Sequence, residues 1–364
     1  MRQSFIRLHN QNMSNPPSSH PRIGYLDAMR GFAILLVVCW HNITWSYYAV
    51  VEEMHVFGNF FWHFLMPMFF FLSGWLFYKK ERTWNLSTAW NVISHKFMQL
   101  MIPTAFFFAV FVYTIGTNHQ DPWNPDKAGY WFTFSLFEYF VFYVFSMIIN
   151  PFKNKGILED VVVVVLALAV HIYAWFNELA IWESGGGIQY WLSLSYFTYY
   201  IFFVLGTLVK KYYDTVLKCF DNQYVMAVLV LLFAAFICYH YRTEYVPQKV
   251  LFVSFLVYSS LGCIITLAFF RKHEDKLSLD TKLGSWLQLL GRRTLDIYLI
   301  HYFFVSRKGL RFLGQLFTEI PHPVVEFAIS VVIATLIIIV VLMVSELIRL
   351  SPFLAKYLLG ARTK

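Results

Sequence analysis

The chain has 364 residues, of which 58% are hydrophobic, 20% aromatic and only 14% charged. A soluble domain carries about a quarter charged residues, so this composition excludes an ordinary soluble protein and indicates a membrane protein. The formal net charge of +8 is explained by basic residues in the loops between apolar segments, so we expect no nucleic-acid partner.

The first segment of the chain is polar. Residues 1–24 include Pro16 and Pro17 and have no apolar signal core, so we interpret them as a disordered cytoplasmic tail. Residues 25–350 are the predicted transmembrane acyltransferase domain, for the reasons developed below. Residues 351–364 are predicted to form a cytoplasmic C-terminal tail.

Apolar runs recur along the chain at lengths that suit a hydrocarbon core of ~30 Å, which needs ~20 residues per helix. The predicted spans are 27–48, 58–78, 97–116, 129–149, 158–176, 189–209, 223–240, 250–270, 285–305 and 324–348. Between the second and third, Leu86, Trp90 and Ile93 recur at helical spacing and predict an amphipathic surface helix over 86–96. We therefore predict an all-α membrane protein, a polytopic bundle of about ten transmembrane helices.

The placement of lysine and arginine predicts the orientation, because cytoplasmic loops are enriched in these residues. With the N-terminus in the cytoplasm, most of the 29 basic residues fall in cytoplasmic segments, and an even number of spans puts both termini there. The basic residues left outside are Lys127, Arg242, Lys249, Arg307, Lys308 and Arg311.

The cysteines predict neither a metal site nor a disulfide framework. Cys39, Cys219, Cys238 and Cys263 are far apart in the sequence, and at least three of them fall in predicted spans. We therefore expect no bound metal and no permanently bound cofactor.

The first span carries Arg30 and His41, eleven residues apart. Eleven residues make three helical turns plus ~20°, so both side chains lie on one face, ~16 Å apart along the axis. Asp27 lies one turn before Arg30 and can orient its guanidinium. An arginine at the cytoplasmic mouth suits the phosphates of an acyl-CoA, and a neutral imidazole deeper in the membrane suits a general base. The structural alternative is that Arg30 extends to the headgroups and His41 hydrogen-bonds a neighbouring helix.

The ninth span repeats this plan, with Arg292 and Arg293 at the cytoplasmic level and His301 at the outer level. Both arginines are either ordinary anchors at the membrane surface or further contacts for acyl-CoA phosphates. Polar groups within a membrane are costly and are therefore candidates for a functional site. Besides His301, the candidates to line the site are Asp27, His63, Ser73, Gly74 and Glu138.

Four segments resemble membrane acyltransferase family 3, and they occur in the family's order. Arg30, ten further residues and His41 match the family's hallmark of a basic residue, ten residues and histidine. Residues 64–77 resemble its Met-Pro…Phe-Leu-Ser-Gly segment, 202–212 its Phe-Gly then Lys-Tyr helix end, and 290–301 its late Tyr-Leu-x-His helix.

The resemblance implies a ten-helix core that takes acyl-CoA from the cytoplasm, as in the single-domain fucose 4-O-acetylases and enterobacterial common antigen O-acetyltransferases. It implies that His41 is catalytic and Arg30 binds the acyl donor, and it extends less closely to Ser73, Gly74 and His301. The chain lacks the soluble hydrolase-like domain that longer members carry at the carboxy terminus.

We therefore predict an integral O-acyltransferase of the bacterial inner (cytoplasmic) membrane. It would move an acyl group, expected to be acetyl, from acyl-CoA to a hydroxyl of a cell-surface glycan or lipid-linked sugar. Acyl-CoA, the glycan or glycolipid acceptor and membrane lipids are its expected partners. The alternative is a transporter or flippase of a lipid-linked sugar or small anion, and a non-catalytic scaffold or sensor is a third reading. Direct transfer and an acyl-histidine relay are both compatible with the sequence, which identifies no donor for the oxyanion.

Overall fold

The computed structural model describes residues 23–47, 56–116, 121–242, 248–306, 308–320 and 322–361, without the side chains of 56–63, 240–242, 248 and 323. Residues 1–22 of the predicted N-terminal tail lie outside these ranges. Within them the chain is helical and contains no β-strand, which confirms the predicted all-α class.

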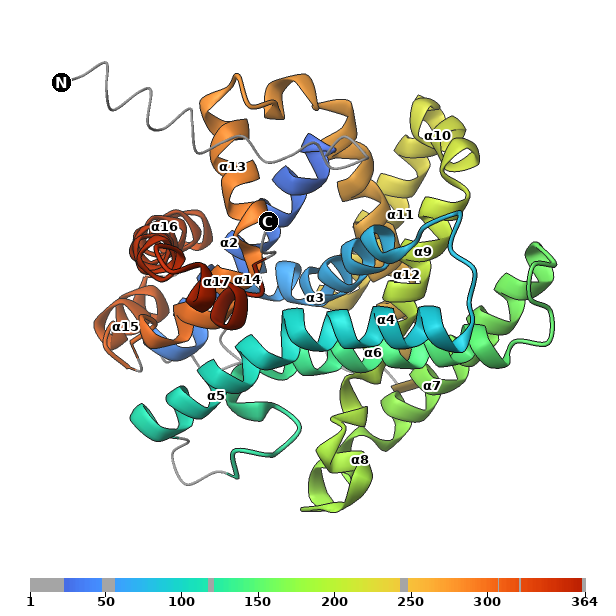
Figure 1. Cartoon of the computed structure of the whole chain (residues 1–364). Coiled ribbons are helices and arrows are strands. Elements are labelled where there is room, and N and C mark those ends of the chain that lie inside the picture. Colours follow the sequence, from blue (N-terminus) through green and yellow to red (C-terminus); the bar gives the residue numbers. More distant parts are fainter. Residues whose placement is uncertain are drawn as a thin grey trace.

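The main helices are α2 (Gly24–His41), α3 (Val56–Phe77), α4 (Leu86–Lys96), α5 (Ile102–Thr114), α6 (Trp131–Ile149), α7 (Ile157–Glu183), α9 (Tyr200–Lys211), α11 (Gln223–Arg242), α12 (Gln248–Lys272), α13 (Lys282–Arg292), α14 (Thr294–Ile300) and α16 (Pro323–Arg349). Shorter helices are α8 (Gly187–Trp191), α10 (Tyr213–Asp221), α15 (Arg311–Glu319) and α17 (Pro352–Leu359). Figure 1 shows that they form a bundle with α2 among α3, α13 and α16.

Six helical segments of the described chain are long and apolar enough to cross a membrane: Gly24–Ser46, Leu86–Thr114, Trp131–Ile149, Ile157–Glu183, Lys249–Lys272 and Val324–Arg349. A bent pair, Tyr213–Asp221 with Gln223–Tyr239, raises the number to seven if it counts as one span. The chain is thus a multi-pass membrane protein, whereas the predicted number of ten spans and the cytoplasmic placement of the termini are not confirmed.

Two of the predicted spans are interrupted. The span predicted at 189–209 divides into α8, a 3₁₀ segment η5 (Leu194–Tyr199) and α9. The span predicted at 285–305 breaks at Arg293, where α13 ends and α14 begins, and continues into a 3₁₀ turn, η7 (His301–Phe303). Non-helical backbone is tolerated at membrane depth where it is enclosed by protein or lines a cavity.

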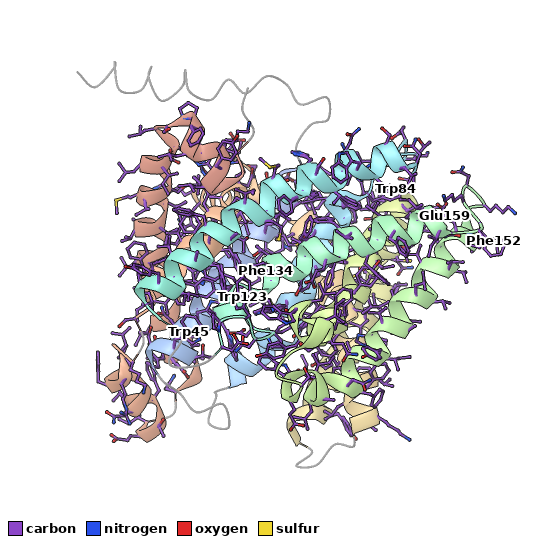
Figure 2. All side chains as sticks on the ribbon, turned by 60° about the horizontal axis from the view of Figure 1, so that its bottom comes forward. Trp45, Trp84, Trp123, Phe134, Phe152 and Glu159 are labelled. Carbon is purple, nitrogen blue, oxygen red and sulfur yellow. The ribbon has the colours of Figure 1, made fainter. Side chains whose placement is uncertain are left out.

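Residues 86–96 form the predicted helix, α4, but it is not a separate element. It continues through a π-helical segment, η3 (Phe97–Met101), into α5, so that Leu86–Thr114 is one segment of 29 residues. Leu86 and Trp90 are exposed on its surface, as expected for side chains that face lipid. Figure 2 shows this segment as a long rod that crosses the bundle beside α6.

Glycines bring α2 and α13 into backbone contact. A Cβ atom added at Gly31 would lie 1.8 Å from the carbonyl oxygen of Leu287, and one added at Gly291 would lie 1.8 Å from that of Asp27. Small residues allow membrane helices to approach this closely, and van der Waals contact then holds them together. The two predicted spans that each carry an arginine at the cytoplasmic end and a histidine at the outer end are therefore packed directly against each other.

A second pair of glycines joins α3 and α9 in the same way. A Cβ atom at Gly74 would lie 1.9 Å from the carbonyl oxygen of Phe203, and one at Gly206 would lie 1.9 Å from that of Phe71. Gly74 and Gly206 belong to the segments 64–77 and 202–212, which resemble family motifs. Each motif therefore supplies one of the two glycines at which α3 and α9 touch.

The loops lie at two opposite ends of the bundle. Figure 2 places Trp45 and Trp123 towards the lower left and Trp84, Phe152 and Glu159 together at the upper right. Trp84, Phe152 and Glu159 belong to loops or helix starts predicted to be cytoplasmic, and Trp45 and Trp123 to the opposite side. The residues predicted as a C-terminal tail include α17, which packs against α5 and η3.

Candidate active site

The imidazoles of His41 and His301 are in direct contact. Nδ1 of His41 lies 2.8 Å from Nε2 of His301, and the two rings stack with their centroids 5.0 Å apart. Each histidine follows the glycine of its own helix, Gly31 or Gly291, by ten residues. The two segments are in contact both at the glycines and at the histidines. The segments α2 and α13–α14 therefore run side by side in the same direction, as predicted from the equal depths of their arginines and histidines.

The hydrogen bonds of His301 determine the tautomers of a neutral pair. Nδ1 of His301 lies 2.9 Å from the carbonyl oxygen of Ile297 and 2.8 Å from that of Tyr298. Because a carbonyl only accepts, this Nδ1 carries the proton and Nε2 of His301 is an acceptor. His41 must therefore donate from Nδ1, which leaves a lone pair on its Nε2. This is the form of histidine that abstracts a proton.

A cavity of about 230 Å³ lies beside His41, between α2, α3, the start of α6, and α14. Its lining residues are Ile34, Val37, Trp40, His41, Thr44, Trp45, Leu65, Met66, Phe69, Asp126, Gly129, Trp131, Phe132, Thr294, Tyr298 and Tyr302. Within the described part of the chain, Nε2 of His41 has no hydrogen-bond partner. The cavity is thus apolar over most of its wall and contains one basic nitrogen.

The outer loop before α6 closes one side of the cavity. Lys127, Ala128 and Gly129 all have positive φ angles, of 49°, 54° and 97°, and this left-handed run turns the carbonyl group of Gly129 inward. That oxygen accepts hydrogen bonds from the hydroxyls of Tyr298, at 2.9 Å, and Tyr302, at 2.6 Å. The Tyr302 ring in turn packs on both histidines, with centroids 5.0 Å from His41 and 4.0 Å from His301. The loop therefore supports the histidine pair through the two tyrosines.

Arg30 lies at the other end of the same face of α2. Ile34 and Val37 line the cavity and lie between Arg30 and His41 at helical spacing. The guanidinium of Arg30 forms an ion pair with Asp27 at 3.6 Å, as predicted, and its side chain is 30% exposed. An apolar strip of helix therefore connects a cationic end with the basic nitrogen.

Arg293 is engaged in an ionic network with α16. Its guanidinium pairs with Glu346 and lies 3.7 Å from a carboxylate oxygen of Asp296, which Arg349 also contacts at 2.6 Å. This arrangement leaves Arg293 with a structural role, joining the break between α13 and α14 to α16. Arg292 is exposed next to the backbone contact between α13 and α2, so it lies at the same end of α2 as Arg30.

Ser73, Gly74 and Glu138 do not line the cavity. The hydroxyl of Ser73 donates to the carbonyl of Phe69 in its own helix, at 2.8 Å, and Gly74 is enclosed in the contact with α9. Glu138 has a buried carboxylate oxygen with no hydrogen-bond partner among the described residues, but it does not line the cavity. The side chain of His63 lies outside the described part of the structure.

Sequence reasoning did not identify Trp45, Asp126, Tyr298 and Tyr302 as site residues. Tyr298 could have been found from its spacing, because it precedes His301 by one helical turn. Asp126 and Trp131 could not, because their position depends on the left-handed turn at Lys127–Gly129.

The conformation of this loop can be tested through the ionisation of Lys127. Only 2% of the surface of Lys127 is exposed, and its ammonium group donates to the carbonyls of Trp123 and Asn124. Burial lowers the pKa of Lys127 to about 8, against a smaller opposing effect of the carboxylates of Glu138, Asp121 and Asp126. In the unfolded chain the pKa is ~10.4.

Between these two pKa values the unfolded chain binds more protons than the folded one, so this lysine makes stability rise with pH over the window. We expect the Tm of the wild type in detergent to increase relative to that of Lys127→Met from about pH 8 to about pH 10. A difference in Tm that stays constant over this range would contradict the buried position of the ammonium group.

The family model of the acyltransferase domain, acyltransferase family 3, matches residues 23–344. The chain belongs to this family, and it is a multi-pass membrane acyltransferase. The matched residues include α2, the cavity and the histidine pair. No curated protein and no solved structure matches the chain.

Proposed function

We propose that this protein is an O-acyltransferase of the bacterial inner membrane that transfers an acyl group, in the first place acetyl, from acyl-CoA to a hydroxyl of a glycan or lipid-linked sugar. The observation that carries the proposal is the environment of His41. His41 lines an apolar cavity, its Nδ1 contacts His301, its Nε2 has no partner among the described residues, and its helix carries Arg30 on the same face.

In the proposed reaction His41 acts as a general base and then as a general acid. Its Nε2 takes the proton of the acceptor hydroxyl while the acceptor oxygen forms a bond to the thioester carbon. The π electrons of the carbonyl move to its oxygen and return when the carbon–sulfur bond breaks. The leaving thiolate takes the proton from Nε2, so acyl-CoA and an alcohol give an ester and free CoA. His301 holds the tautomer throughout, because its Nδ1–H remains bound to two backbone carbonyls.

The charge distribution along α2 favours a donor with phosphates at one end and a thioester at the other. Arg30 is cationic and partly exposed, whereas Ile34 and Val37 present only hydrocarbon to the cavity. The phosphates of CoA would bind at Arg30, with Arg292 as a further contact, and the extended arm would lie along the apolar strip. The predicted orientation places this end in the cytoplasm, where acyl-CoA is available.

The opposite wall of the cavity suits a sugar. Aromatic side chains from α2, α6 and α14 surround the space near His41, and Asp126 supplies a carboxylate from the outer loop. Aromatic rings pack on the apolar face of a sugar, and a carboxylate accepts hydrogen bonds from its hydroxyls. A cavity of about 230 Å³ is smaller than the ~300–1,000 Å³ of typical ligand sites. It would hold the acyl group and the ring that receives it, with the remainder of both substrates outside.

The proposal is tested with purified protein in lipid nanodiscs and radiolabelled acetyl-CoA, with glycolipids offered as acceptors. We expect release of CoA together with transfer of label to an acceptor. A transporter of lipid-linked sugars would leave the thioester intact, so the absence of both CoA release and label transfer would overturn the proposal.

Arg30→Ala is expected to raise the KM for acetyl-CoA by about 10- to 100-fold, because a hydrogen bond to a charged group contributes ~1.5–3 kcal/mol. The kcat should change much less, since Arg30 is ~16 Å from the reacting atoms. Arg271→Ala is the control, because Arg271 pairs with Asp221 and does not line the cavity. An unchanged KM in Arg30→Ala would remove Arg30 from the donor site.

A further inference from the structure

We propose that the indole N–H of Trp131, at the N-terminal end of α6, binds the oxyanion that forms during acyl transfer. The inference rests on the proposed function, because it assigns a catalytic group within the same cavity. A tetrahedral intermediate of acyl transfer carries negative charge on the former carbonyl oxygen. Hydrogen-bond donors that already point to this position stabilise it strongly.

The hydroxyl groups that line the cavity already donate to other groups. Thr44 donates to the carbonyl of Trp40, at 2.9 Å, and Thr294 to that of Gly291, at 2.8 Å. The hydroxyls of Tyr298 and Tyr302 both donate to Gly129, as described above. A hydroxyl has one proton, so each of these groups would have to break an existing hydrogen bond in order to bind an oxyanion.

The indole of Trp131 differs from these hydroxyls. Trp131 lines the cavity and is only 8% exposed, and within the described part of the chain its N–H donates to no protein group. An indole nitrogen is a donor only and cannot accept. A donor of a cavity-lining residue that has no partner in the protein is available to the acceptor of a ligand.

Aromatic stacking fixes the orientation of this indole. The ring of Tyr196 lies parallel to it, with centroids 3.9 Å apart and planes inclined by 12°, and the ring of Tyr199 stacks at 5.7 Å. A donor held in this way needs little reorganisation when charge develops, which is the condition for electrostatic catalysis. The same stacking covers one face of the Trp131 ring.

The helix end supports the same assignment. α6 begins at Trp131 and has no side-chain cap, and its second residue, Phe132, also lines the cavity. The N–H groups of a first helical turn lack partners within the helix, and the helix dipole places partial positive charge there. The N–H of Trp131 itself is bound to the carbonyl of Asp126 at 3.2 Å, and that of Phe132 to the hydroxyl of Tyr298. The helix end therefore contributes through its dipole. The nearby carboxylate of Asp126 accepts from the hydroxyl of Tyr196 at 3.4 Å, and so lies beside the stacked ring.

Trp131→Phe tests the proposal, since it removes the N–H and keeps a ring for the stack. We expect kcat to fall by ~10²–10³-fold, the usual effect of losing one oxyanion donor. The KM for acetyl-CoA and the Tm should stay close to the wild-type values, because this N–H has no partner in the protein. Trp123→Phe is the matched control: Trp123 is 42% exposed, lies in the outer loop that precedes α6 and does not line the cavity, so the turnover of this variant should be unchanged.

The outcomes separate this inference from the proposed function. Turnover retained in Trp131→Phe but lost in His41→Ala would overturn the role of Trp131 alone. A raised KM with unchanged kcat would also overturn it, because Trp131 would then bind the ground state and the transition state equally. A fall in Tm that accounts for the lost activity would make Trp131 a packing residue. If the wild type leaves the thioester intact, the proposed function fails and this assignment fails with it.

Discussion

Replacing His41 with alanine is expected to lower kcat for acyl transfer by ~10²–10⁴-fold, the usual contribution of a positioned general base. Nε2 of His41 is the one imidazole nitrogen of the described pair whose lone pair is not already engaged, because Nδ1 of His301 donates to backbone carbonyls and Nε2 of His301 accepts from Nδ1 of His41. The measurement is release of CoA from labelled acetyl-CoA by wild type and variant at equal amounts of folded protein. Wild-type turnover in His41→Ala would show that another group takes the proton.

His301 provides a graded version of the same experiment. His301→Gln retains an oxygen that can accept a hydrogen bond from Nδ1 of His41, whereas His301→Leu has a similar size and no acceptor. We expect His301→Gln to keep substantially more of the wild-type kcat than His301→Leu, because only the glutamine can hold the tautomer of His41. Equal losses in both variants would assign His301 a role in packing alone.

The second large effect is expected from Gly74→Ala, which should prevent the protein from reaching its folded state or lower its Tm strongly. The added Cβ atom would lie 1.9 Å from the carbonyl oxygen of Phe203, far inside van der Waals contact. Because the obstacle is the backbone of α9, no side-chain rotation can relieve it. Overpacking of a core costs ~1–3 kcal/mol and occasionally more. The yield of monodisperse protein and its thermal unfolding in detergent measure the effect.

Two controls separate packing from catalysis in this experiment. Ser73→Ala removes a hydroxyl that bonds to its own helix and should keep turnover within about twofold of the wild type. Gly186→Ala places a Cβ where no atom lies within 4 Å and should leave the Tm unchanged. If Gly74→Ala folds normally but loses turnover, Gly74 belongs to the active site and the packing explanation is wrong.

The arginine–histidine plan could be predicted from the sequence because it depends only on helix geometry. Eleven residues place Arg30 and His41 on one face, and the equal spacing after Gly31 and Gly291 brings His301 to the same depth. The contact between the two imidazoles follows from the close helix approach that the glycines allow.

Other parts of the site depend on tertiary structure. The three consecutive positive φ angles at Lys127–Gly129 include two residues that rarely adopt them, so no local pattern predicts the turn that brings Trp131 to the cavity. The break at Arg293 is similar. The sequence predicts one continuous span over 285–305, whereas Asp296 and Arg293 form ion pairs with α16 that hold two shorter helices in place.

The backbone contact between α2 and α13 restricts which part of the enzyme can move. Two helices that interlock at Gly31 and Gly291 cannot slide or rotate past each other without a backbone collision. His41 of α2 and His301 beyond α13 therefore keep their relative position, in contrast to the rocking halves of an alternating-access carrier. In the proposed reaction the base stays in place, so the donor has to extend along α2 from the arginine to the thioester beside His41. A donor too short to span this distance would be excluded by length alone.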